Sequence, residues 1–152
     1  MTMQRPEYYF EDFEVGDEFI TPGRTIGEYE IAQFAGLSGD YNPIHTDAAF
    51  ASESPFGQRI AHGLLGLSVL TGLVNRLGLF EACTIALLGI EDWRFLKPVF
   101  AGDTVHGVVL IKDKRLTSDG KRGVLTREYR LENQRGETLQ RGTLPLLAKC
   151  RP

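Results

Sequence analysis

The sequence predicts an α+β fold in which a curved antiparallel sheet wraps around one long, buried helix. The first observation is an apolar stretch at residues 64–74. It is too short for a membrane span, which needs about 20 apolar residues, and predicts a core helix instead. The second is a series of β-type segments after it, joined by short polar turns as in an antiparallel meander. A helix that is apolar on all faces has to be covered, and a strongly curved sheet can cover it.

The composition predicts one globular domain over residues 1–152. A chain of 152 residues can bury a core without disulfides or a structural metal, and its 42% apolar and 24% charged residues are ordinary for a globular protein. The net charge is −3 and there is no basic block, so we expect no nucleic-acid partner. The acidic, aromatic start differs from a signal peptide, and the lone Cys83 and Cys150 are typical of a reducing compartment. We therefore expect a cytoplasmic protein without membrane contact.

Up to the buried helix, the chain predicts short elements and turns. They are a strand at 17–26, a helix at 28–37, a turn-rich loop at 38–43, a short helix from 46 to 51 and an irregular stretch at 52–59. Pro22 and Gly23 interrupt the strand. The helix at 28–37 has apolar residues at helical intervals and an acidic first turn, which suits the positive end of its dipole. Thr46 and Asp47 are suitable N-caps for the helix that follows.

From residue 62 on, one helix precedes a run of strands. The helix is expected at 62–77 and the strands at 84–96, 104–116, 123–132 and 138–149, with turns at 118–121 and 133–136. A curved sheet around a single helix is the hotdog fold. Such a sheet keeps an exposed edge strand, and pairing of two edges would cover it. We therefore expect a homodimer or an assembly of dimers.

Residues 34–51, FAGLSGDYNPIHTDAAFA, place a carboxylate and an imidazole five residues apart across a rigid turn. Pro43 fixes its own φ and favours an extended Asn42, whose side chain can bond the backbone of the turn. Asp40 and His45 could then face one cavity, where such a pair positions a water and moves its protons. A plain surface turn has the same composition, with Asp40 bonded to backbone amides and His45 as a loop histidine. The spacing alone leaves both interpretations open.

The buried helix opens with His62 and Gly63. A helix N-terminus has free backbone N–H groups and the positive end of the dipole, and glycine allows a ligand to approach closely. The N–H of Gly63 is therefore a candidate to hold a substrate oxygen that gains negative charge. The alternative is an ordinary helix start, with Gly66 and Gly72 allowing close packing of helix and sheet.

The segment 34–51 resembles the signature of R-specific enoyl-CoA hydratases in the MaoC-like family. The matching residues are Phe34, Leu37, Ser38, Gly39, Asp40, Asn42, Pro43, Ile44, His45 and Ala51. The segments 62–65, 95–99 and 102–104 are also similar to the family, so the resemblance covers most of the chain. It implies the hotdog fold and the reversible addition of water to a trans-2-enoyl-CoA, giving an (R)-3-hydroxyacyl-CoA in fatty acid metabolism. It also implies that neither a metal nor an organic cofactor is needed.

The resemblance implies a role for each candidate residue. Asp40 and His45 hold the reacting water and shuttle its protons, and the N–H of Gly63 binds the thioester carbonyl. Ser68 matches a pocket serine near the acid, and Asn42 shapes the turn. Together with His62, which opens the helix, Ser68 and Asn42 are the expected substrate-binding residues.

Two other functions are kept as alternatives. Many hotdog acyl-CoA thioesterases carry an acidic residue in the central helix, and residues 64–74 contain none. A non-catalytic CoA-thioester binding subunit would tolerate loss of the acid or the histidine, and both are present. The sequence does not define the length or branching of the acyl chain.

Several other residues are weaker candidates. They are His106 as a surface residue, Trp93 and Phe95 in packing, and Arg59, Arg94 and Lys97 near the CoA phosphates. His45 with Asp47 supplies too few ligands for a metal site.

Overall fold

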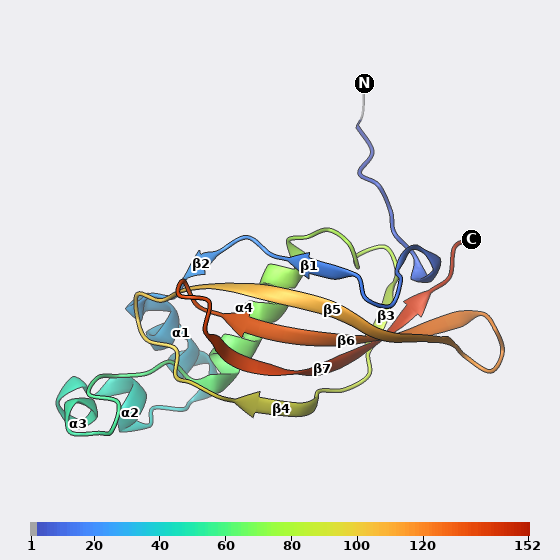
Figure 1. Cartoon of the computed structure of the whole chain (residues 1–152). Helices are drawn as coiled ribbons and strands as arrows, with labels where there is room; N and C mark the ends of the chain where they lie inside the picture. The colour runs from blue at the N-terminus through green and yellow to red at the C-terminus, as the bar shows by residue number, and fades with distance from the viewer. Residues whose placement is uncertain (1–2) are drawn as a thin grey trace.

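The computed structural model describes residues 3–152 as a curved antiparallel sheet, a central helix and three shorter helices at one end (Figure 1). The helices are α1 (Glu28–Ser38), α2 (Pro43–Thr46), α3 (Ala48–Ser52) and α4 (Gly63–Asn75), preceded by a 3-10 turn at Phe10–Asp12. The strands are β1 (Glu18–Ile20), β2 (Arg24–Thr25), β3 (Thr84–Leu87), β4 (Glu91–Phe95), β5 (Thr104–Leu116), β6 (Arg122–Glu132) and β7 (Thr138–Lys149). The predicted α+β hotdog fold is confirmed. No helix in the described residues is long and apolar enough to cross a membrane.

Strands β5, β6 and β7 form the body of the sheet. The strands pair in the order β1-β5-β6-β7-β3, while β2 also pairs with β5 and β4 with β7. β6 pairs with both neighbours along almost its whole length, which confirms the predicted meander. The strand expected at 84–96 is divided into β3 and β4 by residues 88–90. Both pieces pair with β7, so together they form one edge of the sheet.

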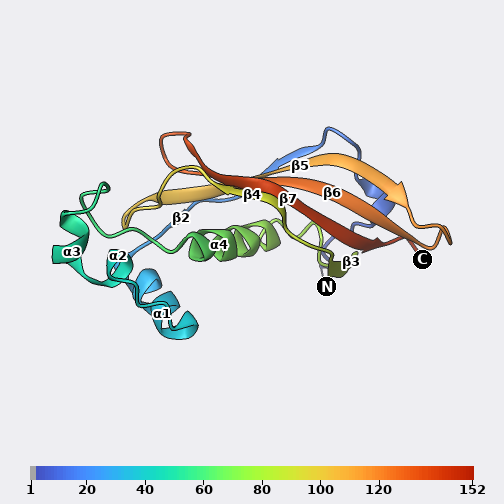
Figure 2. The same cartoon turned by 90° about the horizontal axis from the view of Figure 1, so that it is seen from below.

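Helix α4 packs its apolar side on the sheet (Figure 2). Leu70 and Leu73 are 0% and 2% exposed, and they belong to one core with residues of β5, β6 and β7. The close approach requires a glycine at Gly66, where a Cβ atom would lie 2.3 Å from the amide nitrogen of Gln140. Gly72 is the other glycine expected to allow close packing of helix and sheet. Within residues 3–152, a Cβ atom at Gly72 would lie within 4 Å of no atom outside the neighbouring backbone of α4. Of the two, only Gly66 is needed for helix–sheet packing.

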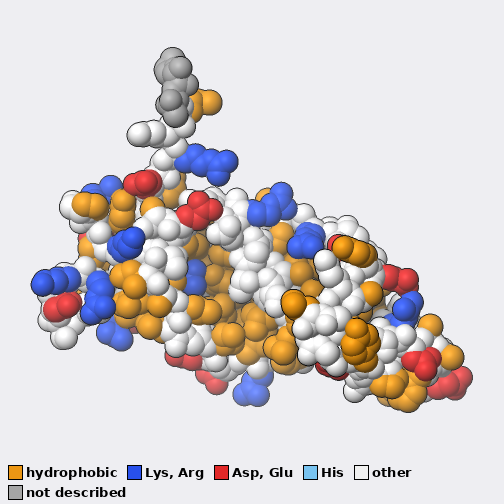
Figure 3. Space-filling view, turned by 180° about the vertical axis from the view of Figure 1, so that it is seen from behind, with side chains coloured by type: hydrophobic (Ala, Val, Ile, Leu, Met, Phe, Trp, Pro, Cys, Tyr) orange, Lys and Arg blue, Asp and Glu red, His pale blue; other side chains and the backbone are white. Residues whose placement is uncertain are grey.

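One side of α4 faces away from the sheet and stays exposed in the single chain. Its residues are Leu64, Ser68, Thr71, Gly72 and Asn75, which we call the open stripe. The sequence predicts a helix covered on every side, but a single sheet covers only the side on which it packs. Figure 3 views the molecule from behind and shows hydrophobic side chains gathered on this face. The open stripe is therefore available to a ligand or to another chain.

The three short helices lie beyond the first turn of α4 and bring the turn-rich loop next to it (Figure 1). The predicted helix at 28–37 corresponds to α1. Asp47 caps α3, since its Oδ1 accepts a hydrogen bond from the backbone N–H of Phe50 at 2.9 Å. The sequence predicts turns at 38–43 but not α2. This helix forms because Pro43 occupies its first position, where a backbone N–H is not required.

Candidate active site

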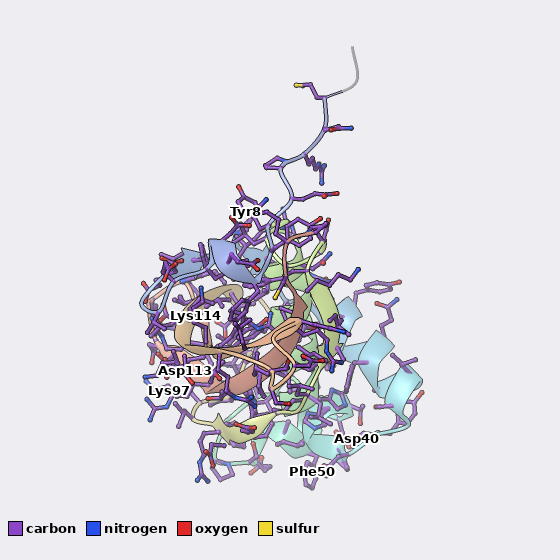
Figure 4. All side chains as sticks on the ribbon, turned by 90° about the vertical axis from the view of Figure 1, so that its right-hand side faces the viewer. Tyr8, Asp40, Phe50, Lys97, Asp113 and Lys114 are labelled. Atoms are coloured by element: carbon purple, nitrogen blue, oxygen red, sulfur yellow. The ribbon has the colours of Figure 1, made fainter. Side chains whose placement is uncertain are left out.

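Asp40, His45 and His62 converge at the N-terminus of α4. Asp40 lies in the loop after α1, His45 lies in α2, and His62 is the N-cap residue of α4. One oxygen or nitrogen atom from each side chain lies within 4.8 Å of the corresponding atoms of the other two. Figure 4 shows Asp40 beside the short helices, apart from Asp113 and Lys114 on β5. The two residues predicted from the turn are thus joined by a histidine from a different segment.

The backbone holds the imidazole of His45 in one orientation. Its Nδ1 lies 2.7 Å from the carbonyl oxygen of Ile60. Because a carbonyl oxygen only accepts hydrogen bonds, Nδ1 carries the proton and Nε2 of the neutral ring has the lone pair. His45 is half-buried. Its Nε2 is therefore suited to take a proton from a water molecule.

His62 is buried, with 3% of its surface exposed. Its Nε2 donates to the main-chain carbonyl oxygen of Asp40 at 2.8 Å. Its ring is stacked on that of His45, with the centroids 3.8 Å apart and 26° between the planes, and Phe34 lies 5.0 Å from it. Nδ1 is fully buried and has no hydrogen-bond partner within residues 3–152. These contacts make His62 the link between α4 and the loop that carries Asp40.

The loop around Asp40 is fixed by its own hydrogen bonds. Oδ1 of Asp40 accepts from the N–H of Asn42 at 3.1 Å, and the Asp40 N–H donates to the hydroxyl of Ser38 at 3.1 Å. Oδ1 of Asn42 accepts from the N–H of Ile44, also at 3.1 Å. Asn42 therefore shapes the turn, and its part in substrate binding stays a prediction.

An apolar hollow of about 540 Å³ lies beside His45 and the first turn of α4. Its lining consists of His45, Phe56, Ile60, Ala61, Gly63, Leu64, Phe95, Leu96, Lys97, Pro98, Val99 and Gln140. Gly63 is the first residue of α4, and its N–H has no backbone acceptor among the described residues. A Cβ atom at Gly63 would lie 2.6 Å from the ring of Phe95, so glycine is also required by packing. His45 and Gly63 share this hollow, whereas Asp40 does not line it.

A second hollow, of about 360 Å³, has a different lining except for His45. Residues of α1, including Ile31 and Ala35, line it together with Tyr41 and Arg59. His45 lines both hollows.

Gln140 is a part of the site that sequence reasoning missed. It is 2% exposed on β7, and its Nε2 donates to the carbonyl oxygen of Gly63 at 3.1 Å. Its Oε1 accepts from Nε1 of Trp93 at 3.3 Å. The available signal was strand alternation, because Gln140 shares a face of β7 with the buried Leu144 and Leu146. A polar residue on that face indicates a buried partner.

Other predicted residues are not members of the cluster of Asp40, His45 and His62, although Arg59 and Lys97 line the hollows beside His45. Ser68 is exposed on the open stripe, donates its hydroxyl to the carbonyl oxygen of Leu64 at 2.7 Å, and lines neither hollow beside His45. His106 is half-buried and lies 3.2 Å from Glu132. Arg59 pairs with Glu28 and Lys97 with Glu137. The role of Ser68 in substrate binding remains a prediction.

The cluster of Asp40, His45 and His62 has the atom types of a metal site, but its geometry is unsuited to one. Lone pairs of imidazole nitrogens lie in the ring plane, and two stacked rings direct them side by side rather than toward one ion. Nδ1 of His45 and Nε2 of His62 are already engaged with backbone carbonyls. That the site works without a metal therefore stays a prediction.

Comparison with known proteins identifies the family. Residues 12–133 match the MaoC like domain. The chain belongs to the MaoC-like domain family. It is 42% identical over 106 residues to Protein MaoC of Klebsiella aerogenes, covering 70% of this chain but only 31% of that protein. It is 36% identical over 104 residues to the (R)-specific enoyl-CoA hydratase of Rhodospirillum rubrum, covering 68% of this chain and 69% of the relative.

Two solved structures share the fold of this chain. The monoamine oxidase regulatory protein from Archaeoglobus fulgius superposes with a TM-score of 0.91 at 37% identity, covering 99% of this chain and 100% of that chain. RV0216 from Mycobacterium tuberculosis, described as a double hotdog fold, gives a TM-score of 0.84 at 19% identity, covering 96% of this chain and 45% of that one. The second likeness shows the fold alone.

Proposed function

We propose that this chain is an R-specific enoyl-CoA hydratase, which adds water reversibly to a trans-2-enoyl-CoA to give an (R)-3-hydroxyacyl-CoA. The observation that carries the proposal is the approach of Asp40 and His45 to within 4.8 Å, beside an apolar hollow that contains Gly63. The hydratase names of relatives at 36% and 38% identity also support it. The acyl chain would occupy an apolar space next to the reacting water.

In the proposed reaction, the water lies between Asp40 and Nε2 of His45. Nε2 accepts a proton from the water as its oxygen bonds to C3 of the enoyl group. The electrons of the C2–C3 double bond move toward the thioester carbonyl, whose oxygen gains negative charge next to the N–H of Gly63. C2 then takes up a proton from the Asp40–His45 pair. All atoms of the water end in the product, and the pair returns to its starting state.

The rate enhancements typical of an acid–base pair and an oxyanion donor are large enough for Asp40, His45 and Gly63 to act without a cofactor. General acid–base catalysis contributes roughly 10²–10⁴-fold. Loss of one oxyanion donor typically costs roughly 10²–10³-fold. His62 holds the loop of Asp40, and the amide of Gln140 holds the first turn of α4. The acid–base pair and the N–H of Gly63 therefore keep their positions relative to each other.

We also propose that the chain works as a homodimer or an assembly of dimers. The edge formed by β3, β4 and the residues between and after them exposes a row of apolar side chains, which we call the apolar edge: Ile85, Leu87, Leu88, Ile90, Phe95 and Leu96, each 41–56% exposed. An unpaired apolar edge favours association with a second strand. Phe95 and Leu96 also line the larger hollow, so a second copy would narrow its opening.

Crotonyl-CoA in the presence of a thiol reagent tests the reaction. Loss of the enoyl absorbance without release of free CoA supports the hydratase, and chromatography on a chiral phase should then give the (R) product. Release of free thiol would instead indicate a thioesterase. Binding without either change would indicate a CoA-thioester binding subunit and would sink the proposal.

A further inference from the structure

Arg127 places a positive charge inside the protein. It lies on β6 between Leu125 and Tyr129 along one face. Arg127 is 5% exposed, Leu125 0% and Tyr129 3%. Alternation along the strand favours an apolar residue at such an inward position. Arginine is almost never buried to this extent unless it is paired. A buried guanidinium therefore requires a source of negative charge.

The described residues around Arg127 supply no such charge. Its Nε donates to the carbonyl oxygen of Leu144 at 3.2 Å, and its guanidinium lies 4.7 Å from the ring of Phe80 and 5.0 Å from the ring of Tyr129. None of the ion pairs within residues 3–152 includes Arg127. A guanidinium has five N–H donors, and the donors not used by the Leu144 carbonyl and the Tyr129 hydroxyl remain for a ligand or water.

The titratable neighbours of Arg127 are neutral. Burial raises the pKa of the Cys83 thiol and of the Tyr129 hydroxyl, so both keep their protons at neutral pH. Burial also lowers the pKa of Arg127, but arginine stays protonated in proteins. Within residues 3–152, therefore, no ionised acid balances the positive charge of Arg127.

Arg127 lines a hollow of about 170 Å³ between the end of α4 and the sheet. Its other lining residues are Thr71, Val74, Asn75, Phe80, Thr84, Leu87, Tyr129, Leu144 and Leu146. The hollow has room for about five water molecules at roughly 30 Å³ each. Thr71 and Asn75 are exposed on the open stripe, so the hollow is reached from that side of α4. Its walls are mainly apolar, with a single cation.

We propose that this hollow is a binding site for an organic carboxylate, with Arg127 as its counter-ion and the apolar walls around its hydrocarbon part. A guanidinium can donate two parallel hydrogen bonds to a carboxylate, which is the strongest arrangement for this pair. A phosphate carries more negative charge than one guanidinium balances, and its further oxygens would face walls that are mainly apolar. The shape and charge of the hollow therefore favour a carboxylate on a short hydrocarbon.

Such a carboxylate has two sources. One is a small free carboxylic acid. The other is the distal carboxylate of a dicarboxylic acyl-CoA, and this source rests on the proposed hydratase function. Gly63 and Thr71 are eight residues apart on α4, which corresponds to about 12 Å at 1.5 Å per residue. Within one chain, only a long acyl group would extend from Gly63 to Arg127.

Calorimetric titration of the full chain with butyrate tests the site, with butyramide as a neutral control of similar shape. We expect butyramide to bind at least ~10-fold more weakly than butyrate. Arg127→Met should lower the affinity for butyrate by at least ~10-fold, and the fold should survive because buried charges are often replaced by apolar residues without loss. Arg130→Met is the matched control, since Arg130 lies on the same strand and pairs with Glu18, Glu128 and Glu132. It should leave butyrate binding unchanged.

Equal binding of butyrate and butyramide to the native chain would overturn the proposal. Unchanged butyrate affinity in a folded Arg127→Met variant would do the same. If that variant does not fold, Arg127→Lys keeps the charge but loses the paired hydrogen bonds, and it should weaken butyrate binding several-fold. The comparison with butyramide needs no variant and decides the question in any case.

Two saturated CoA thioesters identify the source of the carboxylate. One is the mono-CoA thioester of dodecanedioic acid, and the other is dodecanoyl-CoA, which lacks the distal carboxylate. If the acyl carboxylate is the ligand, the dicarboxylic thioester binds at least ~10-fold more tightly, and Arg127→Met removes the difference. If a free acid is the ligand, the two thioesters bind alike and only butyrate depends on Arg127. Saturated thioesters cannot be hydrated, so these readouts do not depend on the proposed reaction. Asp40→Asn should still bind butyrate, which separates failure of this site from failure of the hydratase proposal.

Discussion

The ring of His62 donates from Nε2 to the main-chain carbonyl oxygen of Asp40 at 2.8 Å, and its face lies on the ring of His45 with the centroids 3.8 Å apart. One buried ring therefore holds both members of the proposed acid–base pair, one through the backbone and the other by stacking. Because His62 is also the N-cap residue of α4, the pair is fixed relative to Gly63. Its role follows from position and needs no proton transfer of its own.

We predict that Asp40→Asn and His45→Gln each lower kcat for crotonyl-CoA hydration by at least ~10²-fold. Each substitution keeps the size of the side chain but removes a group that binds or releases a proton. The measurement is steady-state hydration kinetics on purified variants, with circular dichroism to verify the fold. Asp113→Asn is the control, since Asp113 is exposed on β5 away from the site (Figure 4). Near-normal turnover of either site variant would remove the proposed pair.

We predict that hydration activity is unchanged after exhaustive chelation, with no nucleotide or other cofactor added. The cluster of Asp40, His45 and His62 is the one place within residues 3–152 where three such ligands meet, and its stacked rings are poorly oriented for an ion. The assay compares the rate before and after chelation and again after zinc is added. Loss of activity on chelation with recovery on zinc would show that the cluster is a metal centre.

Some features of the fold and of the site are determined within a single segment of the chain and could be predicted from the sequence. Asp40 and His45 were predictable because five residues and an Asn-Pro turn determine their separation. The strands β5, β6 and β7 were predictable because each has long β-type patterning and ends in a polar turn. In these cases the information lies within one segment of the chain.

Other features depend on contacts between distant segments. His62 lies 22 residues from the backbone carbonyl that it binds, and Gln140 lies 77 residues from Gly63. The position of Ser68 on the open stripe is set by the phase of α4 relative to the sheet. That phase is set by which side of the helix packs on β5 to β7, and an all-round apolar helix gives no indication of it.

We predict a particle of twice 16.9 kDa, or a multiple of it, by light scattering at micromolar concentration. Leu88→Glu combined with Ile90→Glu should shift it toward the monomer, because charges on the apolar edge would have to be buried in the interface. Leu116→Glu is the matched control, with 53% exposure against 51% for Leu88 but on β5, which β6 and β7 separate from the apolar edge. A native chain that is monomeric, or a control that dissociates equally, would contradict the proposed interface.

We predict that Gly66→Ala destabilises the protein although alanine favours helix. Alanine is better than glycine in a helix interior by up to about 1 kcal/mol. The new Cβ would lie 2.3 Å from Nε2 of Gln140, and that side chain is held by Gly63 and Trp93. Moving it breaks buried hydrogen bonds or strains the helix, and overpacking of this kind costs about 1–3 kcal/mol. Denaturant unfolding should therefore show a lower free energy of unfolding.

Shortening Gln140 tests whether this contact is the cause. In a Gln140→Ala background the space beside Gly66 is empty, so adding Gly66→Ala should cost little or should stabilise the helix. The double-mutant cycle should thus give a coupling free energy of about 0.5–3 kcal/mol between the two positions. Gln140→Ala alone should also slow hydration, because the carbonyl of Gly63 loses its donor and the first turn of α4 can shift. If Gly66→Ala costs the same in both backgrounds, Gln140 does not set the position of α4, and its assigned part in holding Gly63 is wrong.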